Sequence, residues 1–263
     1  MSEDAGPSVL EGVETKGLVV VYRYAVERTD HSALASGQVL RSAPGFPGFP
    51  VRLASELFQR ALAHTKDMGR TRVRLWDPCC GSGYLVTVLG LLHRDRLEHV
   101  CASDVDDDAV ALAARNVELL STEGLVAREE ELRRSARDFG RPAFVERAEA
   151  ARELAEGLAA RGGDLPHEAV LADVFELSCP VRADLVITDV PYGEMTSWEG
   201  AAPEEEPLQA MLESLGRVLP AHAVVVITAR TRRISLPEGV HALERLKVGN
   251  RAGAFVRARD IAP

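Results

Sequence analysis

The sequence predicts an α/β protein built on a doubly wound, mostly parallel sheet of seven strands that ends in an antiparallel hairpin. Three observations support this fold class. Short apolar runs alternate with helical segments from Val73 onward, and aspartates follow several of these runs. The turn-forming pair Gly249-Asn250 separates two final extended segments, which predicts the hairpin.

The first 66 residues are expected to form an N-terminal extension that packs on the core. This section contains a predicted strand at Leu18–Val26, a Pro/Gly loop at Pro44–Pro50 and a helix at Val51–Thr65 with apolar residues at helical spacing. Phe46 and Phe49 in the loop are candidates for a lid over a site, but ordinary packing is the favoured interpretation.

Residues 67–263 are expected to form the main domain. Its strands are predicted at Val73–Trp76, His99–Ser103, Ala169–Leu171, Asp184–Thr188, Ala223–Thr228, Ala242–Val248 and Ala254–Arg259. Its helices are predicted at Tyr84–His93, Asp106–Leu120 and Leu208–Leu219. Residues 121–163 are rich in Ala, Glu and Arg without a β-branched run, which predicts a helical insertion of one or two helices. A solvent-exposed spacer is its favoured interpretation.

The composition is typical of a globular protein, with 46% hydrophobic and 27% charged residues. The apolar runs are too short to cross a bilayer and the acidic N-terminus lacks a leader pattern, so we expect a cytoplasmic protein with no membrane partner. The four cysteines form no C-x-x-C pair and no ligand-spaced cluster with histidines, so neither a metal site nor a disulfide framework is expected.

The formal net charge of -9 argues against a protein that coats nucleic acid non-specifically, although a local basic patch remains compatible with it. Arginines cluster at residues 70–74, 230–233 and 251–259, and each cluster taken alone is interpreted as solvated surface charge. Since no apolar interface helix stands out, we expect a monomer.

The stretch from Asp77 to Tyr84 reads DPCCGSGY and lies where a strand ends and a helix begins. Ligands of open α/β sheets bind at the carboxyl ends of strands, and glycines there allow a ligand to approach the backbone closely. A dinucleotide fingerprint requires a third glycine where this chain has Val86, so a nicotinamide dehydrogenase is disfavoured.

The same stretch resembles the D-x-x-x-G-[ST]-G loop of class I S-adenosylmethionine-dependent methyltransferases, which have a Rossmann-like fold. The resemblance implies S-adenosylmethionine as cofactor, with Asp77 near its amino group and with Gly81 and Gly83 making room for it. The cofactor-binding residues expected on this basis are Asp77, Pro78, Cys79, Gly81, Ser82, Gly83, Asp104, Val105, Asp173 and Val174.

Two further aspartates of this set have distinct expected roles. Asp104 closes the second strand, where an acidic side chain can accept hydrogen bonds from both ribose hydroxyls. The resemblance assigns Asp173 to the adenine amino group. An aspartate after a strand is also a common helix N-cap or turn residue, and this is the favoured role of Asp106. Cys79 and its neighbour Cys80 are expected to be small packing residues under the loop.

A second motif, Asp189-Val190-Pro191-Tyr192, follows the fourth predicted strand. It resembles the [DN]-P-P-[YFW] motif of amino-group methyltransferases that act on nucleobases and on glutamine side chains, with Val190 in place of the first proline. Pro191 still biases Val190 towards an extended conformation. A tight turn with a packed tyrosine is the alternative, which the position at a strand end disfavours.

The motif suits the chemistry of an exocyclic base nitrogen, whose lone pair is delocalised into the ring. If Asp189 and the carbonyl of Val190 each accept one N–H, they direct that lone pair towards the methyl group. Tyr192 is expected to stack on the exposed or flipped base. Glu194 and Trp198 are candidates for the rim of the pocket, although packing or loop roles are favoured for both.

Together, DPCCGSGY, SDVDD, ADVF and TDVPYGE resemble the family of avilamycin-resistance 23S ribosomal RNA guanine methyltransferases of antibiotic-producing actinomycetes. The resemblance implies methylation of a guanine base in 23S ribosomal RNA, as free RNA or in the large subunit, and resistance to an oligosaccharide antibiotic. The sequence leaves N1 and N2 of the guanine open. A protein glutamine methyltransferase and a catalytically silent RNA-binding module remain the alternatives.

Overall fold

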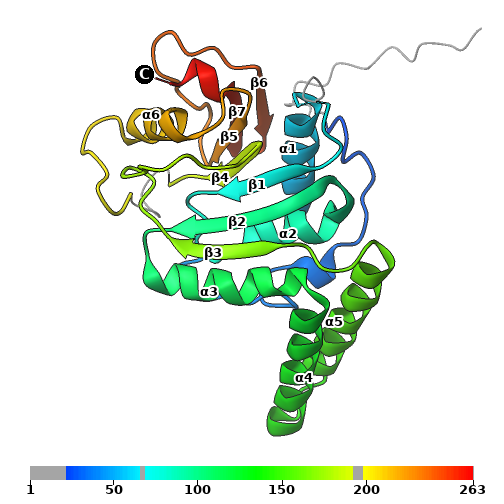
Figure 1. Ribbon diagram of the computed structural model, residues 1–263. Coiled ribbons are helices and arrows are strands. Elements are labelled where there is room, and N and C mark those ends of the chain that lie inside the picture. Colours follow the sequence, from blue (N-terminus) through cyan, green and yellow to red (C-terminus); the bar gives the residue numbers. More distant parts are fainter. Residues whose placement is uncertain (1–21, 66–68, 192–197, 263) are drawn as a thin grey trace, which may run out of the picture.

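The computed structural model describes residues 22–65, 69–191 and 198–262. Its centre is a seven-stranded sheet with the order β3-β2-β1-β4-β5-β7-β6 (Figure 1). The strands are β1 (Val73–Asp77), β2 (Leu97–Asp104), β3 (His167–Leu171), β4 (Leu185–Asp189), β5 (Val224–Ala229), β6 (Glu244–Val248) and β7 (Arg251–Arg257). The strands β1 to β5 are parallel, and β7 lies antiparallel to both β5 and β6. The predicted mostly parallel sheet with a terminal hairpin is confirmed.

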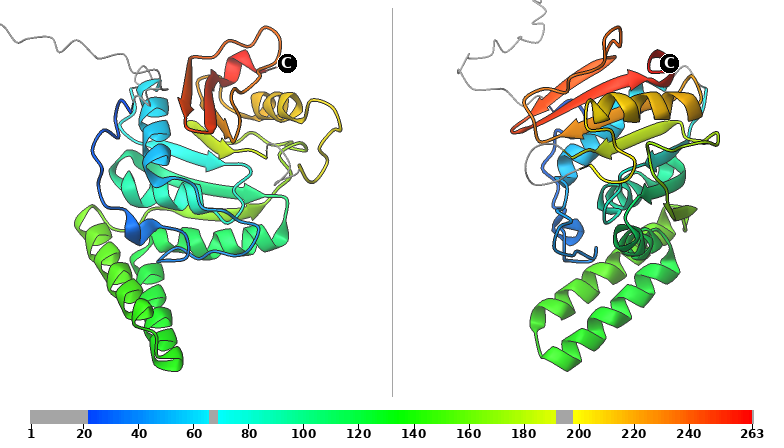
Figure 2. Two further views of the ribbon diagram at one scale, coloured as in Figure 1. Left: turned by 180° about the vertical axis from the view of Figure 1, so that it is seen from behind. Right: turned by 90° about the vertical axis from the view of Figure 1, so that its left-hand side faces the viewer.

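Helices cover both faces of this sheet (Figures 1 and 2). They are α1 (Val51–Ala63), α2 (Tyr84–Leu92), α3 (Asp107–Val117), α4 (Thr122–Phe139), α5 (Pro142–Ala160) and α6 (Pro207–Val218). Successive strand residues point to opposite faces, so Leu75 joins the core formed with α1, α2 and α3, whereas Trp76 joins the core formed with α6. The two cores together hold the strand ends in fixed positions.

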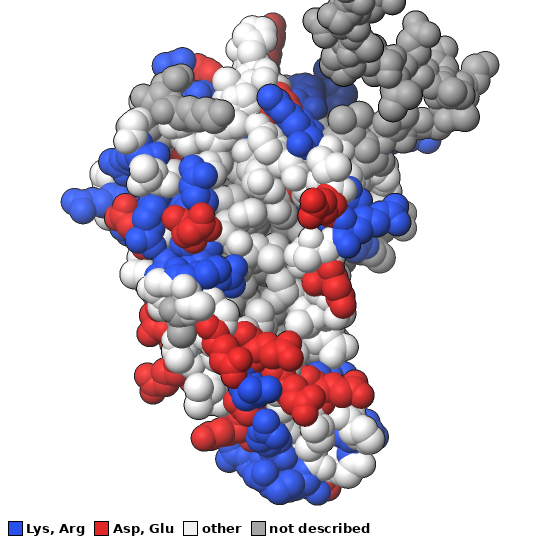
Figure 3. All heavy atoms as spheres, turned by 90° about the vertical axis from the view of Figure 1, so that its right-hand side faces the viewer, with Lys and Arg blue, Asp and Glu red and all other residues white. Residues whose placement is uncertain are grey.

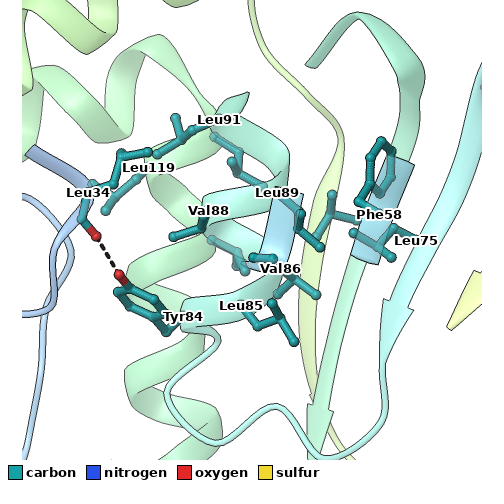
Figure 4. Close-up of a cluster of buried hydrophobic side chains, with 14 of the residues drawn as sticks. Leu34, Phe58, Leu75, Tyr84, Leu85, Val86, Val88, Leu89, Leu91 and Leu119 are labelled. Atoms are coloured by element: carbon teal, nitrogen blue, oxygen red, sulfur yellow. Dashed lines mark hydrogen bonds between the residues drawn. The ribbon is translucent and has the colours of Figure 1, made fainter. Parts of the chain in front are cut away.

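Helix α2 is apolar around most of its circumference because it lies between the sheet and the N-terminal extension. Val86, Val88 and Leu89 are fully buried within one cluster with Leu34 of that extension (Figure 4). The hydroxyl of Tyr84, the first residue of α2, donates a hydrogen bond of 2.7 Å to the carbonyl of Leu34. The extension therefore contributes to the same core as the sheet.

The prediction of a strand at Leu18–Val26 is wrong for the residues that the structure describes. Residues 18–21 lie outside the described residues, and residues 22–26 form no strand. The backbone N–H groups of Arg23, Tyr24 and Ala25 instead donate to the buried carboxylate of Glu56 at 2.7–2.9 Å. These donors are satisfied by a side chain of α1, so this segment needs no neighbouring strand.

The predicted insertion at residues 121–163 forms two helices, α4 and α5, which pack against each other and project from the rest of the molecule (Figures 1 and 2). The side chain of Ser121 caps the start of α4 by accepting from the N–H of Gly124 at 3.0 Å. Gly140, with a φ of 61°, ends α4 in the left-handed conformation that favours glycine. We call α4 and α5 with their connection, residues 122–160, the helical arm.

The remaining predicted elements differ from the structure by a few residues at their ends. The helix predicted at Asp106–Leu120 ends at Val117 and continues as a 3₁₀ turn, Glu118–Leu120. The last strand was predicted from Ala254 but begins at Arg251. The two-residue turn Gly249-Asn250 places Arg251 directly opposite Val248, so the antiparallel pairing starts there.

Candidate active site

The carboxyl ends of the parallel strands meet at one edge of the sheet, and each of four strands leads into an aspartate there. Asp77, Asp104 and Asp189 are the final residues of β1, β2 and β4, and Asp173 follows the end of β3 by two residues. Besides burial, the nearby charges of Asp104 and Asp189 raise the pKa of Asp77. The sequence-predicted aspartates therefore gather at one edge of the sheet.

The glycine turn between β1 and α2 lies beside these aspartates. Gly81 and Gly83 have φ angles of 51° and 68°, which L side chains adopt only with strain. A Cβ atom on Gly83 would lie 3.0 Å from the Cα atom of Ala113 in α3. The N–H of Gly81 donates to Oδ2 of Asp104 at 2.8 Å, which fixes the turn to the end of β2. The turn is thus compact and holds its backbone towards the strand ends.

Asp77 is a buried carboxyl group, with 2% of its surface exposed. Burial raises its pKa to about 7, while Thr188 and the backbone N–H of Cys79, 3.2 Å from Oδ1, oppose the increase. A buried carboxyl with a raised pKa is stabilised in its charged form when a cation binds beside it. The amino group of a methionine moiety is a cation of this kind, so Asp77 fits the role that the sequence predicts.

The two cysteines of the turn are protonated thiols. Burial, followed by the charge of Asp77, raises the pKa of Cys79 and that of Cys80 well above the usual value. Cys80 belongs to the core on the α2 face, and Cys79 packs against the core on the opposite face. A thiol that keeps its proton is a poor nucleophile, which agrees with the predicted packing role.

Asp104 and Asp106 accept hydrogen bonds from different backbone groups. Asp106 caps α3, because its carboxylate accepts from the N–H of Ala109 at 2.8 Å, as predicted. Asp104 accepts from the N–H groups of Gly81 and Asp106. Each carboxylate oxygen can accept two hydrogen bonds, so Asp104 retains capacity for ribose hydroxyls.

Asp173 is covered by the segment that follows the substrate motif. Its Oδ1 and Oδ2 accept from the N–H groups of Phe175 (2.8 Å) and Ala201 (2.6 Å). A Cβ atom on Gly200 would lie 2.2 Å from Oδ2 of Asp173 and 3.0 Å from a methyl carbon of Val105. Glycine at position 200 therefore allows the chain to close over two residues, Asp173 and Val105, that the sequence predicts to bind the cofactor.

The substrate motif is only partly described. Val190 is buried, and its N–H donates to the carbonyl of Thr228 in β5 at 2.9 Å, which fixes the chain as it leaves β4. Tyr192 and Glu194 lie outside the described residues, so their predicted roles remain predictions. Trp198 is half-buried and meets Phe175 edge to face, with ring centroids 5.6 Å apart.

Asp189 forms an ion pair with a residue that sequence reasoning missed. Nη1 of Arg251, the first residue of β7, donates to Oδ1 of Asp189. The guanidinium carbon of Arg251 lies 4.6 Å from the ring centroid of Phe49. Burial raises the pKa of Asp189, and the charges of Arg251 and Arg230 oppose the increase. Arg251 is 5% exposed, so its interpretation as solvated surface charge is wrong.

The N-terminal extension reaches the same edge of the sheet through the Pro/Gly loop. Phe49 is buried against Arg251, and a Cβ atom on Gly81 would lie 3.4 Å from Phe46. Asn116, also unnoticed in the sequence, links the turn to this extension. Its amide donates to the carbonyl of Ser82 at 2.9 Å, and its oxygen accepts from the N–H of Arg41 at 2.8 Å.

The sheet order, the glycine turn after β1 and the aspartates ending β1 and β2 define a Rossmann-like methyltransferase. The chain belongs to the rRNA methyltransferase AviRa family, which it matches over residues 20–251. Within the described residues, no helix is long and apolar enough to cross a membrane, and no group of three or more His, Cys, Asp or Glu side chains is arranged to hold a metal ion.

Two comparisons illustrate this membership. The chain is 55% identical over 246 residues to the 23S rRNA (guanine(2535)-N(1))-methyltransferase of Streptomyces viridochromogenes, covering 91% of this chain and 97% of the relative. It is also similar to solved structures of the rRNA methyltransferase aviRa from the same organism. The 1.5 Å structure has 53% sequence identity and a TM-score of 0.82, with 91% of this chain and 97% of the other covered.

Proposed function

We propose that this protein transfers a methyl group from S-adenosylmethionine to N1 of a guanine in 23S ribosomal RNA, acting as a cytoplasmic monomer. The observation that carries the proposal is the Asp189–Arg251 pair at the end of β4, on the sheet edge that holds the glycine turn. The relative from Streptomyces viridochromogenes, named for N1 methylation of guanine 2535, supports the choice of N1 over N2.

Methylation of N1 assigns Asp189 a different task from the one expected for an exocyclic amine. N1 of guanine carries one proton, and removing it places negative charge on the ring and on O6. Asp189 accepts the N1 proton, while Arg251 offers a donor and a positive charge to O6. Burial raises the pKa of Asp189, which makes its carboxylate a stronger base, and the charge of Arg251 opposes this increase.

S-adenosylmethionine supplies, when bound, a methyl group on a positively charged sulfur. With the cofactor held by Asp77, Gly81, Gly83 and Asp104, methyl transfer to N1 would leave the sulfur as a neutral thioether. The proton taken by Asp189 then passes to solvent. The contribution of the protein is alignment of the nitrogen with the methyl carbon and exclusion of water from the Asp189–Arg251 pair.

The residues at the strand ends fit this cofactor. Asp77, whose pKa is raised by burial, would face the cofactor's amino group; the turn with positive φ at Gly81 and Gly83 would lie beside the methionine portion; and Asp104 would accept the ribose hydroxyls. The full proposed set is the one predicted from sequence: Asp77, Pro78, Cys79, Gly81, Ser82, Gly83, Asp104, Val105, Asp173 and Val174 for the cofactor, and Asp189, Val190, Pro191 and Tyr192 for the substrate.

Methyl transfer to several acceptors side by side tests the proposal. Purified protein is incubated with radiolabelled S-adenosylmethionine and either 23S rRNA, large ribosomal subunits or total cell protein. We expect label in 23S rRNA, either free or within the subunit. Label in protein alone would favour a glutamine substrate, and RNA binding without any label would indicate a silent binding module; either result would contradict the proposal. We also expect expression of the protein to confer resistance to an avilamycin-type antibiotic.

A further inference from the structure

The helical arm carries opposite charges at its two ends (Figure 3). Its free end, residues 133–147, contains five arginines against one aspartate and one glutamate, which gives a formal charge of +3. The part of α4 nearer the sheet, residues 122–132, contains four glutamates and one arginine, for a formal charge of -3. The whole chain has a net charge of -9, so the charge of this end is opposite in sign to that of the protein as a whole.

Three arginines at the free end are available to a partner. Arg134, Arg137 and Arg141 are exposed and form no ion pair among the described residues. By contrast, Arg133 pairs with Glu129 one turn earlier on α4, at 2.7 Å. Unpaired cations retain their full capacity to bind phosphate groups.

An exposed aromatic ring lies at the same end of the arm as these arginines. Phe139, the last residue of α4, is 67% exposed. Its ring centroid is 6.1 Å from that of Phe144, which itself lies under the guanidinium of Arg147 at 5.4 Å. A ring that is held on one side and open on the other presents a face on which a nucleobase can stack.

The base of the arm is fixed to the N-terminal extension, so its free end has a defined position relative to the site. The guanidinium of Arg128 donates to the carbonyls of Val39 and Gln38, and Glu131 pairs with Arg41 at 2.6 Å. The backbone of Arg41 is bonded in turn to Asn116, whose amide also contacts the glycine turn. From Arg128 to its last residue, Phe139, α4 continues for about 16 Å beyond this anchor.

We propose that the free end of the arm binds the RNA substrate away from the methylated guanine, with Arg134, Arg137 and Arg141 on phosphates and Phe139 stacked on an unpaired base. The proposal rests on the proposed function, since it assumes that the substrate is a large folded RNA. The positive charge and open aromatic ring favour RNA over an acidic protein, which would satisfy the arginines but not the ring. The arm thus acts as a second contact that orients the RNA over the strand ends, not as a passive spacer.

The test compares a variant of the arm with a variant matched in charge. The first combines Arg134→Gln, Arg137→Gln and Arg141→Gln. The control combines Arg152→Gln, Arg217→Gln and Arg259→Gln, which also removes three exposed positive charges. Arg152 lies on α5. Arg217 and Arg259 lie near the starts of β4 and β5, at the edge of the sheet opposite the candidate active site. All six side chains are exposed, so both variants should fold with melting temperatures close to that of the wild type.

Methyl transfer is measured on full-length 23S rRNA and on a short RNA that contains only the target guanine and its neighbouring nucleotides. For the arm variant we expect KM for the full-length RNA to rise roughly 10- to 100-fold with kcat unchanged. A plot of log KM against log salt concentration should have a slope smaller by about two than that of the wild type. The control should keep the wild-type KM. On the short RNA, the arm variant and the wild type should have the same KM.

A separate substitution, Phe139→Ala, should raise KM for the full-length RNA about tenfold. Equal KM values for the arm and control variants on full-length RNA would overturn the arm proposal while leaving the proposed function intact. Failure of the wild-type protein to methylate either RNA would instead contradict the proposed function. If the arm variant lost binding to an acidic protein while its KM for RNA was unchanged, the arm proposal would also be overturned.

Discussion

Replacing Asp77 with asparagine should change how the stability of the protein depends on pH. A raised folded-state pKa means that the folded protein keeps a proton that the unfolded chain has released, so this group makes stability fall as pH rises from about 4 to about 7. Asparagine has no such proton. It keeps an oxygen that can accept from the N–H of Cys79, so the turn should be preserved in the Asp77→Asn variant.

The magnitude follows from the two pKa values, the ordinary 3.8 in the unfolded chain and about 7 in the folded protein. Between pH 5 and pH 8, this shift lowers the free energy of unfolding of the wild type by about 3 kcal/mol. Other groups titrate over the same range, but they are shared by the variant. The wild type should therefore lose about 3 kcal/mol more than the Asp77→Asn variant over this interval.

Urea unfolding of both proteins at pH 5 and pH 8, without cofactor, measures this difference directly. The variant should be similar to the wild type in stability at pH 5 and more stable at pH 8. If the free energies of unfolding of the two proteins differ by the same amount at both pH values, Asp77 is ionised throughout, and the argument from its burial fails.

Three further substitutions test the site. Asp189→Asn should lower kcat for RNA methylation roughly 10²- to 10⁴-fold and leave the Kd for S-adenosylmethionine unchanged, because Asp189 is proposed to act on the base and not on the cofactor. Asp104→Ala should raise that Kd about 10- to 100-fold, as measured by calorimetry, because the proposed hydrogen bonds from the ribose hydroxyls to this carboxylate are lost. Gly83→Ala should lower the free energy of unfolding by about 1–3 kcal/mol in urea, because its φ is positive and Ala113 leaves no space for a methyl group.

Each of these expectations has a result that would contradict it. If cofactor binding by Asp189→Asn fell by as much as kcat for RNA methylation, Asp189 would belong to the cofactor site. An unchanged Kd in Asp104→Ala would remove Asp104 from the ribose. Wild-type stability in Gly83→Ala would show that the turn can move away from Ala113.

Much of the fold could be predicted because it depends on patterns local to the chain. Buried parallel strands appear as short apolar runs such as Val73–Asp77, and an aspartate marks the point where several of them end. The turn pair Gly249-Asn250 identified the hairpin without knowledge of any distant contact. The two-helix insertion was visible from its composition alone.

The errors arose where residues far apart in sequence meet. The segment from Tyr22 to Val26 has the alternation of a strand, but its N–H groups bind Glu56, about 30 residues later. Arg251 is 62 residues from Asp189 in the sequence. Only the strand order places β7 beside β5, so that Arg251, the first residue of β7, lies at the edge of the sheet where the parallel strands end. The sequence contained one usable signal for Arg251, namely that an antiparallel strand starts at the edge where its parallel neighbour ends.

The central claim is tested most directly by identifying the modified nucleoside. Unmodified 23S rRNA is treated with the protein and S-adenosylmethionine, digested to nucleosides and analysed by mass spectrometry against methylguanosine standards, with the Asp189→Asn variant in parallel. We predict one equivalent of 1-methylguanosine per RNA with the wild-type protein and almost none with the variant. N2-methylguanosine would contradict the assignment of N1, and 1-methylguanosine at the same level with both proteins would contradict the role of Asp189.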